Sequence, residues 1–116
     1  MSQEGVALAI AVASAFAFAF ALAVAPSPAL ADVAAGRTKA QMCAPCHGAN
    51  GLALTPNTPH LAGQPEPYLV DQLKAYRSGK RAHEVMGVVA KPLTDVDIAD
   101  LAAWFASLEI VLRKEP

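Results

Sequence analysis

The sequence predicts a small all-α domain with about three main helices, preceded by an apolar N-terminal leader. The 116 residues leave room for one domain at most. Segments with helical periodicity are separated by a stretch rich in Gly and Pro, which is typical of a long loop. The leader alternates Ala with larger apolar residues, but the strong helix propensity of Ala and the lack of any other strand-like segment argue against a sheet.

Residues 1–31 form the predicted leader. An uncharged run from Val6 to Ala25 is followed by the small-residue sequence Ala29-Leu30-Ala31, a plausible cleavage site before Asp32. This pattern predicts a signal peptide and a periplasmic protein. However, the extreme N-terminus has no Lys or Arg and carries Glu4, and the run has about the 20 residues that cross a bilayer. An uncleaved anchor of residues 6–25 in the inner membrane is therefore the alternative.

The first main helix is expected from about Asp32 through Met42. Its Gly36 and Ala40 lie four residues apart and offer a smooth face for close helix crossing. Residues 48–66 are too rich in Gly and Pro for regular structure, and a long loop in so small a domain is usually functional.

Two further helices are expected after this loop. The second begins near Pro67 and ends at Gly79. The last begins at Thr94, where Asp97 completes a variant of the capping box. Its apolar face consists of Ile98, Leu101, Ala102, Phe105 and Leu108, with Trp104 beside it.

The first predicted helix runs into Cys43-Ala44-Pro45-Cys46-His47. This C-x-x-C-H spacing is the one by which a chain attaches haem covalently: both thiols add to the porphyrin, and the histidine ligates iron. A zinc site is an alternative, but the sequence has no further Cys, so His60 and His83 would have to serve from loops. A redox-active disulfide is another, but its usual βαβ context is absent. The motif favours one covalent haem.

Residues 32–116, the predicted mature domain, have no net formal charge. They contain all nine Lys and Arg residues of the chain and all of its ten acidic residues except Glu4. Two haem propionates would make the domain slightly acidic, so no nucleic acid partner is expected. A domain of this size buries a modest share of its surface, and an apolar macrocycle would supply much of the missing core.

Several further motifs join the haem motif in one pattern. They are Gly36, Gly48 with Asn50-Gly51, Pro59-His60-Leu61-Ala62-Gly63-Gln64, Tyr68-Leu69, Gln72-Leu73, Arg77-Ser78-Gly79-Lys80-Arg81, Met86, Leu93-Thr94-Asp95 and Ala102-Ala103-Trp104. With this combination, residues 32–116 resemble a short bacterial class I cytochrome c, especially small single-haem cytochromes and the halves of dihaem cytochromes. The resemblance implies a class I cytochrome c fold, with the helices wrapped around one covalent haem c.

The resemblance also implies a set of site residues. Cys43 and Cys46 would hold the haem covalently, and His47 and Met86 would be the axial ligands of its iron. Met86 is expected on a loop between the second and last helices. The backbone carbonyl of Pro59 would accept the second ring hydrogen of His47 and fix the orientation of that ligand.

Other residues could in principle compete with Met86 for the iron. Met1 lies in the leader, and Met42 adjoins the haem motif and is expected to point from the wrong side. His60 and His83 are expected to be loop histidines that face solvent. If His83 replaced Met86, ligation by two histidines would lower the reduction potential.

One departure from the family pattern concerns the first helix. Relatives often have a large apolar or aromatic residue where this chain has Lys39 and Ala40, so looser packing against Trp104 is expected. The acidic residues, among them Asp95, Asp97 and Asp100, are expected to be solvated and to complement the helix dipole. No catalytic set is evident among them.

With both axial positions filled, the predicted function is transfer of one electron at a time between extracytoplasmic redox partners by an outer-sphere route, without enzymatic activity. A relay subunit of a larger oxidoreductase complex, for instance one that oxidises a reduced sulfur compound, is the first alternative. A gas-binding or peroxidase-like protein with a labile Met86 is the second.

A cluster of cations lies around the end of the second predicted helix. Lys74, Arg77, Lys80 and Arg81 could steer the domain to an acidic redox partner. The same residues could simply complement the dipole at the end of a solvated helix, and Arg81 could pair with a haem propionate. Contact with a membrane is expected only if the leader is retained.

Overall fold

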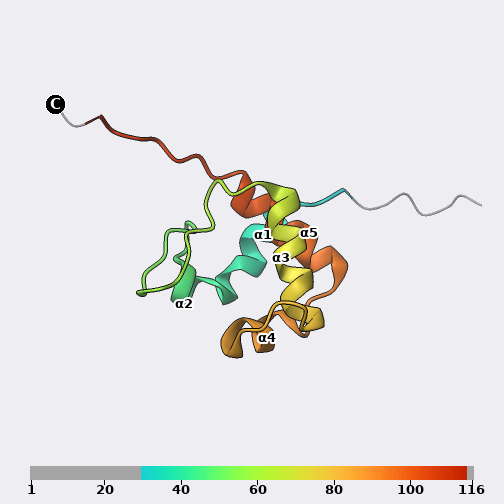
Figure 1. The fold of residues 1–116 in the computed structure, drawn as a ribbon. Coiled ribbons are helices and arrows are strands. Elements are labelled where there is room, and N and C mark those ends of the chain that lie inside the picture. The colour runs from blue at the N-terminus through green and yellow to red at the C-terminus, as the bar shows by residue number, and fades with distance from the viewer. Residues whose placement is uncertain (1–29, 115–116) are drawn as a thin grey trace, which may run out of the picture.

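The computed structural model describes residues 30–114, which form a helical domain with no strand in that range (Figure 1). The helices, in chain order, are α1 (Val33–Lys39), the 3₁₀ helix η1 (Ala40–Met42), α2 (Ala44–His47), α3 (Glu66–Ser78), α4 (Glu84–Ala90) and α5 (Asp95–Ala106). Within these described residues, no helix has both the length and the apolar character needed to cross a bilayer. Residues 1–29 of the predicted leader lie outside the described part.

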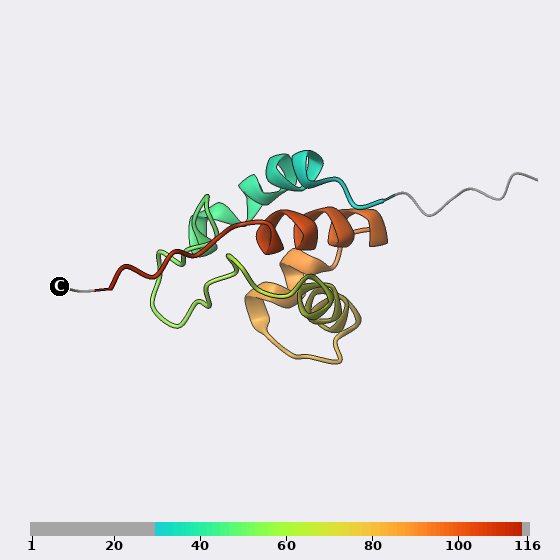
Figure 2. The same ribbon diagram turned by 90° about the horizontal axis from the view of Figure 1, so that it is seen from above.

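Helices α1 and α5, distant in sequence, lie side by side in the fold (Figure 2). Gly36 is buried where they meet, and a Cβ added there would lie 1.9 Å from the backbone oxygen of Asp100 and 2.8 Å from Cβ of Trp104. The two backbones therefore approach so closely that a side chain larger than that of glycine does not fit at position 36, as the predicted small-residue face indicated.

Helix α5 is the centre of the hydrophobic core. Ile98 and Leu101 are its largest fully buried side chains, and α3 packs across it with Leu69. The remaining buried members of this cluster are Ala40, Ala90, Leu93, Ala102 and Phe105. The apolar stripe predicted for the last helix therefore faces the core.

The ends of α3 and α5 follow the predicted signals. Helix α3 has Pro67 in its first turn, and Gly79 ends it in the left-handed region with φ of 81°. At the start of α5, Thr94 and Asp97 form a capping box in which each side chain bonds to the backbone of the other.

The first helical segment runs from Val33 to Met42, close to the predicted bounds, and α1 tightens into η1 within it before the chain turns into α2. One prediction about helices was wrong. The segment around Met86 is not a loop but helix α4, whose N-cap is His83: its Nδ1 accepts from the backbone N–H groups of Val85 and Met86 at 3.2 Å. A histidine cap is a weak sequence signal, since Ser, Thr, Asp and Asn are the usual caps.

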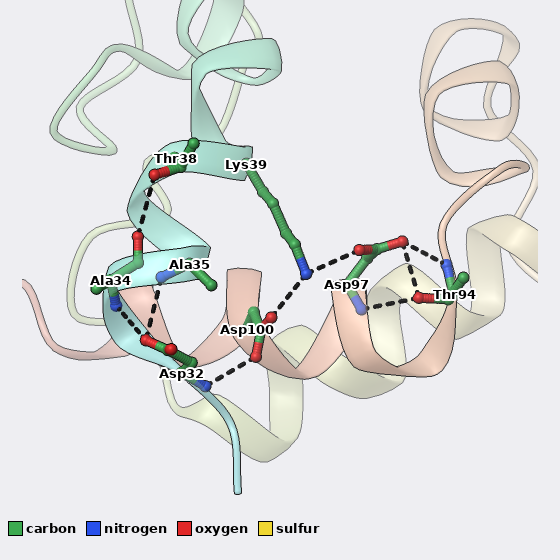
Figure 3. Close-up of polar contacts among 8 residues, drawn as sticks. All are labelled: Asp32, Ala34, Ala35, Thr38, Lys39, Thr94, Asp97 and Asp100. Carbon is green, nitrogen blue, oxygen red and sulfur yellow. Dashed lines mark hydrogen bonds and ion pairs between the residues drawn. The ribbon is translucent and has the colours of Figure 1, made fainter. Parts of the chain in front are cut away.

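Asp100 also differs from its predicted role as a solvated acid (Figure 3). It is only 4% exposed, and Nζ of Lys39 lies 2.6 Å from its Oδ2 and 2.8 Å from Oδ1 of Asp97. These bonds raise the pKa of Lys39. The Asp32 N–H and Lys39 lower the pKa of Asp100, and Lys39 and Thr94 lower the pKa of Asp97 to about 2. Lys39, expected to loosen the packing, instead joins α1 to α5.

Candidate haem-binding site

A cavity of about 370 Å³ opens among α2, the loop of residues 48–65, α3, α4 and α5. This volume lies in the range of small-molecule and cofactor sites, about 300–1,000 Å³. Its walls are mainly apolar and include Leu61, Leu69, Leu73, Val89 and Phe105. An apolar macrocycle therefore meets chemically matched walls here.

Both cysteines of the C-x-x-C-H motif line this cavity as free thiols. The short helix α2 places Cys46 one helical turn after Cys43, and Gly48 then turns the chain away with φ of 77°. Burial raises the pKa of the Cys43 thiol to about 11. Within residues 30–114, no group of three or more His, Cys, Asp or Glu side chains could hold a metal ion.

His47 is buried, 8% exposed, and forms part of the cavity wall. Its Nδ1 lies 2.9 Å from the backbone oxygen of Pro59. Because a carbonyl oxygen can only accept a hydrogen bond, Nδ1 carries the proton, and Nε2 is left with the free lone pair that binds a metal. The ring is thus held in the tautomer required of an axial ligand.

The loop that carries Pro59 is fixed by backbone hydrogen bonds. The carbonyl of Gly51 accepts from the N–H groups of Leu61 and Ala62 at 2.7 and 3.1 Å, and the N–H of Gly63 donates to Phe105 of α5 at 2.9 Å. These bonds hold both ends of the segment against its neighbours, so the position of the Pro59 carbonyl is set by the fold.

Met86 lines the cavity from α4, a different element from the one that carries His47. Val85 and Val89, four residues apart, line it from the same helix. The sequence analysis did not identify Val85 and Val89 as cavity residues. Their spacing of four residues, on either side of Met86, is the helical signal that could have predicted α4. Met42 also borders the cavity, so position alone does not separate the two methionines.

The two additional histidines border the cavity with exposed side chains. His60 accepts a hydrogen bond at Nδ1 from the backbone N–H of Ala53 at 2.7 Å, and His83 caps α4 through the same ring atom. One ring nitrogen of each is therefore engaged with local backbone.

The four residues of the predicted cationic cluster differ in their contacts with the rest of the domain. Arg77 donates to Asp95 at 2.6 Å and to the backbone oxygen of Leu93 at 2.9 Å. The guanidinium of Arg81 lies 4.6 Å from the ring centre of Tyr76, on the cavity wall. The side chains of Lys74 and Lys80 make no hydrogen bond or ion pair with other residues in the described range. Two of the four cations are thus held by internal contacts.

Comparison with known proteins identifies the family. Residues 33–109 match the cytochrome c family. The chain belongs to this family. It is 48% identical over 79 residues to cytochrome c4 of Pseudomonas aeruginosa and 44% identical over 81 residues to cytochrome c-554(548) of Halomonas halodenitrificans. The cofactor of this class I cytochrome c is covalently bound haem c, which the thiol pair and the apolar cavity fit.

The matched regions differ in how much of each relative they cover. They span 68% of this chain and 39% of the Pseudomonas cytochrome c4, but 67% of this chain and 98% of the Halomonas protein. The crystal structure of reduced recombinant cytochrome c4 from Pseudomonas stutzeri superposes with a TM-score of 0.64 at 38% identity, over 68% of this chain and 46% of that one. A thiosulfate dehydrogenase electron acceptor of Thiomonas intermedia is 40% identical over 82 residues, 70% of this chain and 38% of its own length. The fold is that of one cytochrome c domain.

Proposed function

We propose that this domain carries one electron at a time between redox proteins and catalyses no bond chemistry. The observation that supports this most strongly is the shared cavity, which is lined by both thiols of the haem motif and by His47 and Met86. Haem c bound there would supply an iron that alternates between the ferric and ferrous states.

Each site residue has a distinct role in this proposal. Cys43 and Cys46 would hold the haem through thioether bonds. His47 donates from Nδ1 to Pro59 and would present Nε2 to the iron, and Met86 would be the second iron ligand. With both residues bound, a substrate could not reach the iron without displacing one of them. The haem would then supply electron exchange without bond chemistry, and ligation by His and Met would favour a higher potential than two histidines would.

The absorption spectrum of the reduced holoprotein with and without carbon monoxide tests this closed site. We expect an unchanged low-spin spectrum in the wild-type protein and a clear shift on carbon monoxide binding in Met86→Ala. Met42→Ala is the matched control, because Met42 borders the same cavity, and it should behave as the wild type does. A shift in the wild-type protein would instead favour gas binding or peroxidase-like chemistry.

A relay role within a larger oxidoreductase complex is a second candidate. It is favoured by the likeness to the thiosulfate dehydrogenase electron acceptor. In that role the domain would accept electrons from a separate catalytic chain and pass them on. Co-purification of the native protein with a larger catalytic subunit would support it, whereas recovery of the protein alone would favour a mobile carrier.

The proposed working compartment is the periplasm, with residues 1–31 removed as a signal peptide or residues 6–25 retained as an anchor. Covalent haem attachment and the apolar run of the leader both support export. Intact mass of the native holoprotein distinguishes the two products.

The proposed docking surface for an acidic partner centres on Lys74 and Lys80. The side chains of these two lysines are exposed, whereas Arg77 is paired with Asp95 and Arg81 is held against Tyr76. Exposed charges of this kind steer encounter more than they strengthen the final complex.

A further inference from the structure

The backbone nitrogen of Asp32 is aimed at a buried carboxylate (Figure 3). Its N–H donates to Oδ1 of Asp100 at 2.8 Å, and Asp100 is 4% exposed. The Asp32 side chain is engaged on the other side, where it accepts from the N–H groups of Ala34 and Ala35 at 2.8 and 3.1 Å. The Asp32 carbonyl accepts from Gly36 at 2.8 Å. Every polar group of Asp32 is thus directed by the fold.

This position is fixed by packing as well as by hydrogen bonds. Since a Cβ at Gly36 would overlap the backbone of Asp100, α1 lies in direct backbone contact with α5. Asp32 stands one turn before that crossing, so its nitrogen cannot move away from Asp100 without separating the two helices.

The charges around this nitrogen do not balance. Asp32, Asp97 and Asp100 supply three carboxylates, and the ammonium of Lys39 contacts the last two at 2.8 and 2.6 Å. The nearby Arg37 lies over the ring of Trp104, 5.6 Å from its centre. Within the described residues, one cation, Lys39, therefore serves both Asp97 and Asp100, and the backbone N–H of Asp32 supplies the other bond to Asp100.

The chain just before Asp32 is non-helical and partly exposed. Leu30 is 94% exposed, Ala31 is half-buried, and residues 30–32 have no helical structure. A peptidase needs an accessible, extended segment, and the sequence Ala29-Leu30-Ala31 has small residues where a signal peptidase requires them.

We propose that cleavage between Ala31 and Asp32 completes a buried ion pair, in which the new α-ammonium of Asp32 becomes the second cationic partner of Asp100. Water adds across the Ala31–Asp32 amide bond: the carbonyl carbon becomes the carboxylate of the departing leader, and the nitrogen becomes the ammonium. The proton released by the new carboxyl group is the one that the amine takes up. This inference rests on the proposed removal of the leader, and not on electron carriage.

The exchange turns an uncharged donor into a charged one at the same place. The existing bond is already charge-assisted through the Asp100 carboxylate, and cleavage adds the attraction between opposite charges at the same contact. The α-ammonium faces the carboxylates of Asp32, Asp97 and Asp100 and the cations Lys39 and Arg37. Because its direct partner is buried Asp100, its pKa should rise above the ordinary value of about 7.7–8.0. The extra stability is then complete below about pH 8 and is lost as pH rises through the raised pKa.

The first test uses holoprotein purified after expression of the full-length chain with haem attachment. Intact mass should place the N-terminus at Asp32. The pH dependence of α-amine labelling by an acylating reagent, followed by peptide mass spectrometry, gives the pKa of that amine. We expect a raised pKa in the wild type and in the exposed-site control Asp71→Asn, and an ordinary value in Asp100→Asn. Only the unprotonated amine reacts with the reagent. At a pH below the pKa of both proteins, each unit by which the amine pKa is raised therefore lowers the labelled fraction about tenfold.

A second variant covers the case in which Asp100→Asn fails to fold. One alanine inserted between Ala31 and Asp32, and shown by mass to remain on the mature chain, keeps every side chain but moves the ammonium one residue away. Its melting temperature should fall by about 4 °C or more.

Three results would overturn the inference: an N-terminus other than Asp32, an ordinary amine pKa that Asp100→Asn does not change, or an unaltered melting temperature in the insertion variant. The visible spectrum of the same samples reports the haem site independently. Failure of the ion pair can therefore be distinguished from failure of the proposed electron carriage.

Discussion

At the scale of single residues, the two unpaired lysines of the cationic cluster in the described range give the clearest prediction about partners. The double variant Lys74→Glu/Lys80→Glu should slow reduction by the physiological donor several-fold at low salt, and the difference should shrink as salt screens the charges. Stopped-flow reduction at two ionic strengths measures it. Arg77→Glu is a poor test, because it also breaks the contact with Asp95.

Arg113→Glu provides the matched control for that experiment. It reverses an exposed cation in the segment after α5, outside the cluster, and should leave the rate nearly unchanged. Equal rates for the double variant and the wild-type protein at low salt would remove Lys74 and Lys80 from the docking surface.

Residue roles could be predicted where they depend on local spacing. The C-x-x-C-H motif placed two thiols and His47 together because all of them lie within five consecutive positions. The partners of Asp100 could not be predicted in this way: Lys39 and Asp32 are 61 and 68 residues away, and only the crossing of α1 with α5 brings them together. The identity of one charged residue in the sequence does not indicate that it forms a buried ion pair with a residue far along the chain.

At the scale of helices, the different surroundings of Gly36 and Gly87 predict opposite effects when each is replaced by alanine. Gly36→Ala should destabilise the holoprotein by about 1–3 kcal/mol, because the new Cβ meets backbone that cannot move aside. Gly87→Ala is the control: it lies inside α4, a Cβ added there has no neighbouring atom within 4 Å, and it does not line the cavity. It should raise stability by up to about 1 kcal/mol.

Chemical denaturation of both holoproteins measures these differences. An unchanged midpoint in Gly36→Ala would mean that α1 and α5 can separate at little cost. Loss of stability in Gly87→Ala would indicate that this position of α4 contacts the bound haem.

The same scale shows why α3 and α5 were predicted and α4 was not. Helix α3 ends at Gly79 and α5 begins with the Thr94 capping box, and both signals act through local backbone geometry. Helix α4 is short and begins at His83, whose ring accepts the two hydrogen bonds that a Ser or Asp usually accepts. Its existence depends on that contact and on packing against α3, which local propensity does not encode.

At the scale of the whole molecule, the protein side chains alone make a thin core. Of the core residues, Ala40, Ala62, Ala90, Ala102 and Ala103 have the smallest apolar side chains, and within the described residues only Ile98 and Leu101 are both large and fully buried. The cavity occupies the place where a domain of this size would normally have more large side chains. Its walls include Leu69, Leu101 and Phe105, so the core and the haem site share residues. We therefore expect haem binding and folding to be coupled.

This coupling predicts that the haem-free chain is poorly folded. Cys43→Ala/Cys46→Ala, which cannot form thioether bonds, should lose most of its native-like near-ultraviolet circular dichroism and melt without a sharp transition when purified without haem. Trp104 is a suitable reporter, because its ring lies between α1 and α5 against Arg37. Met42→Ala, which keeps the haem, should retain the native signal. A haem-free chain with native dichroism and a cooperative transition would show that the helices hold together around an empty cavity, and that the buried alanines, Ile98 and Leu101 suffice as a core.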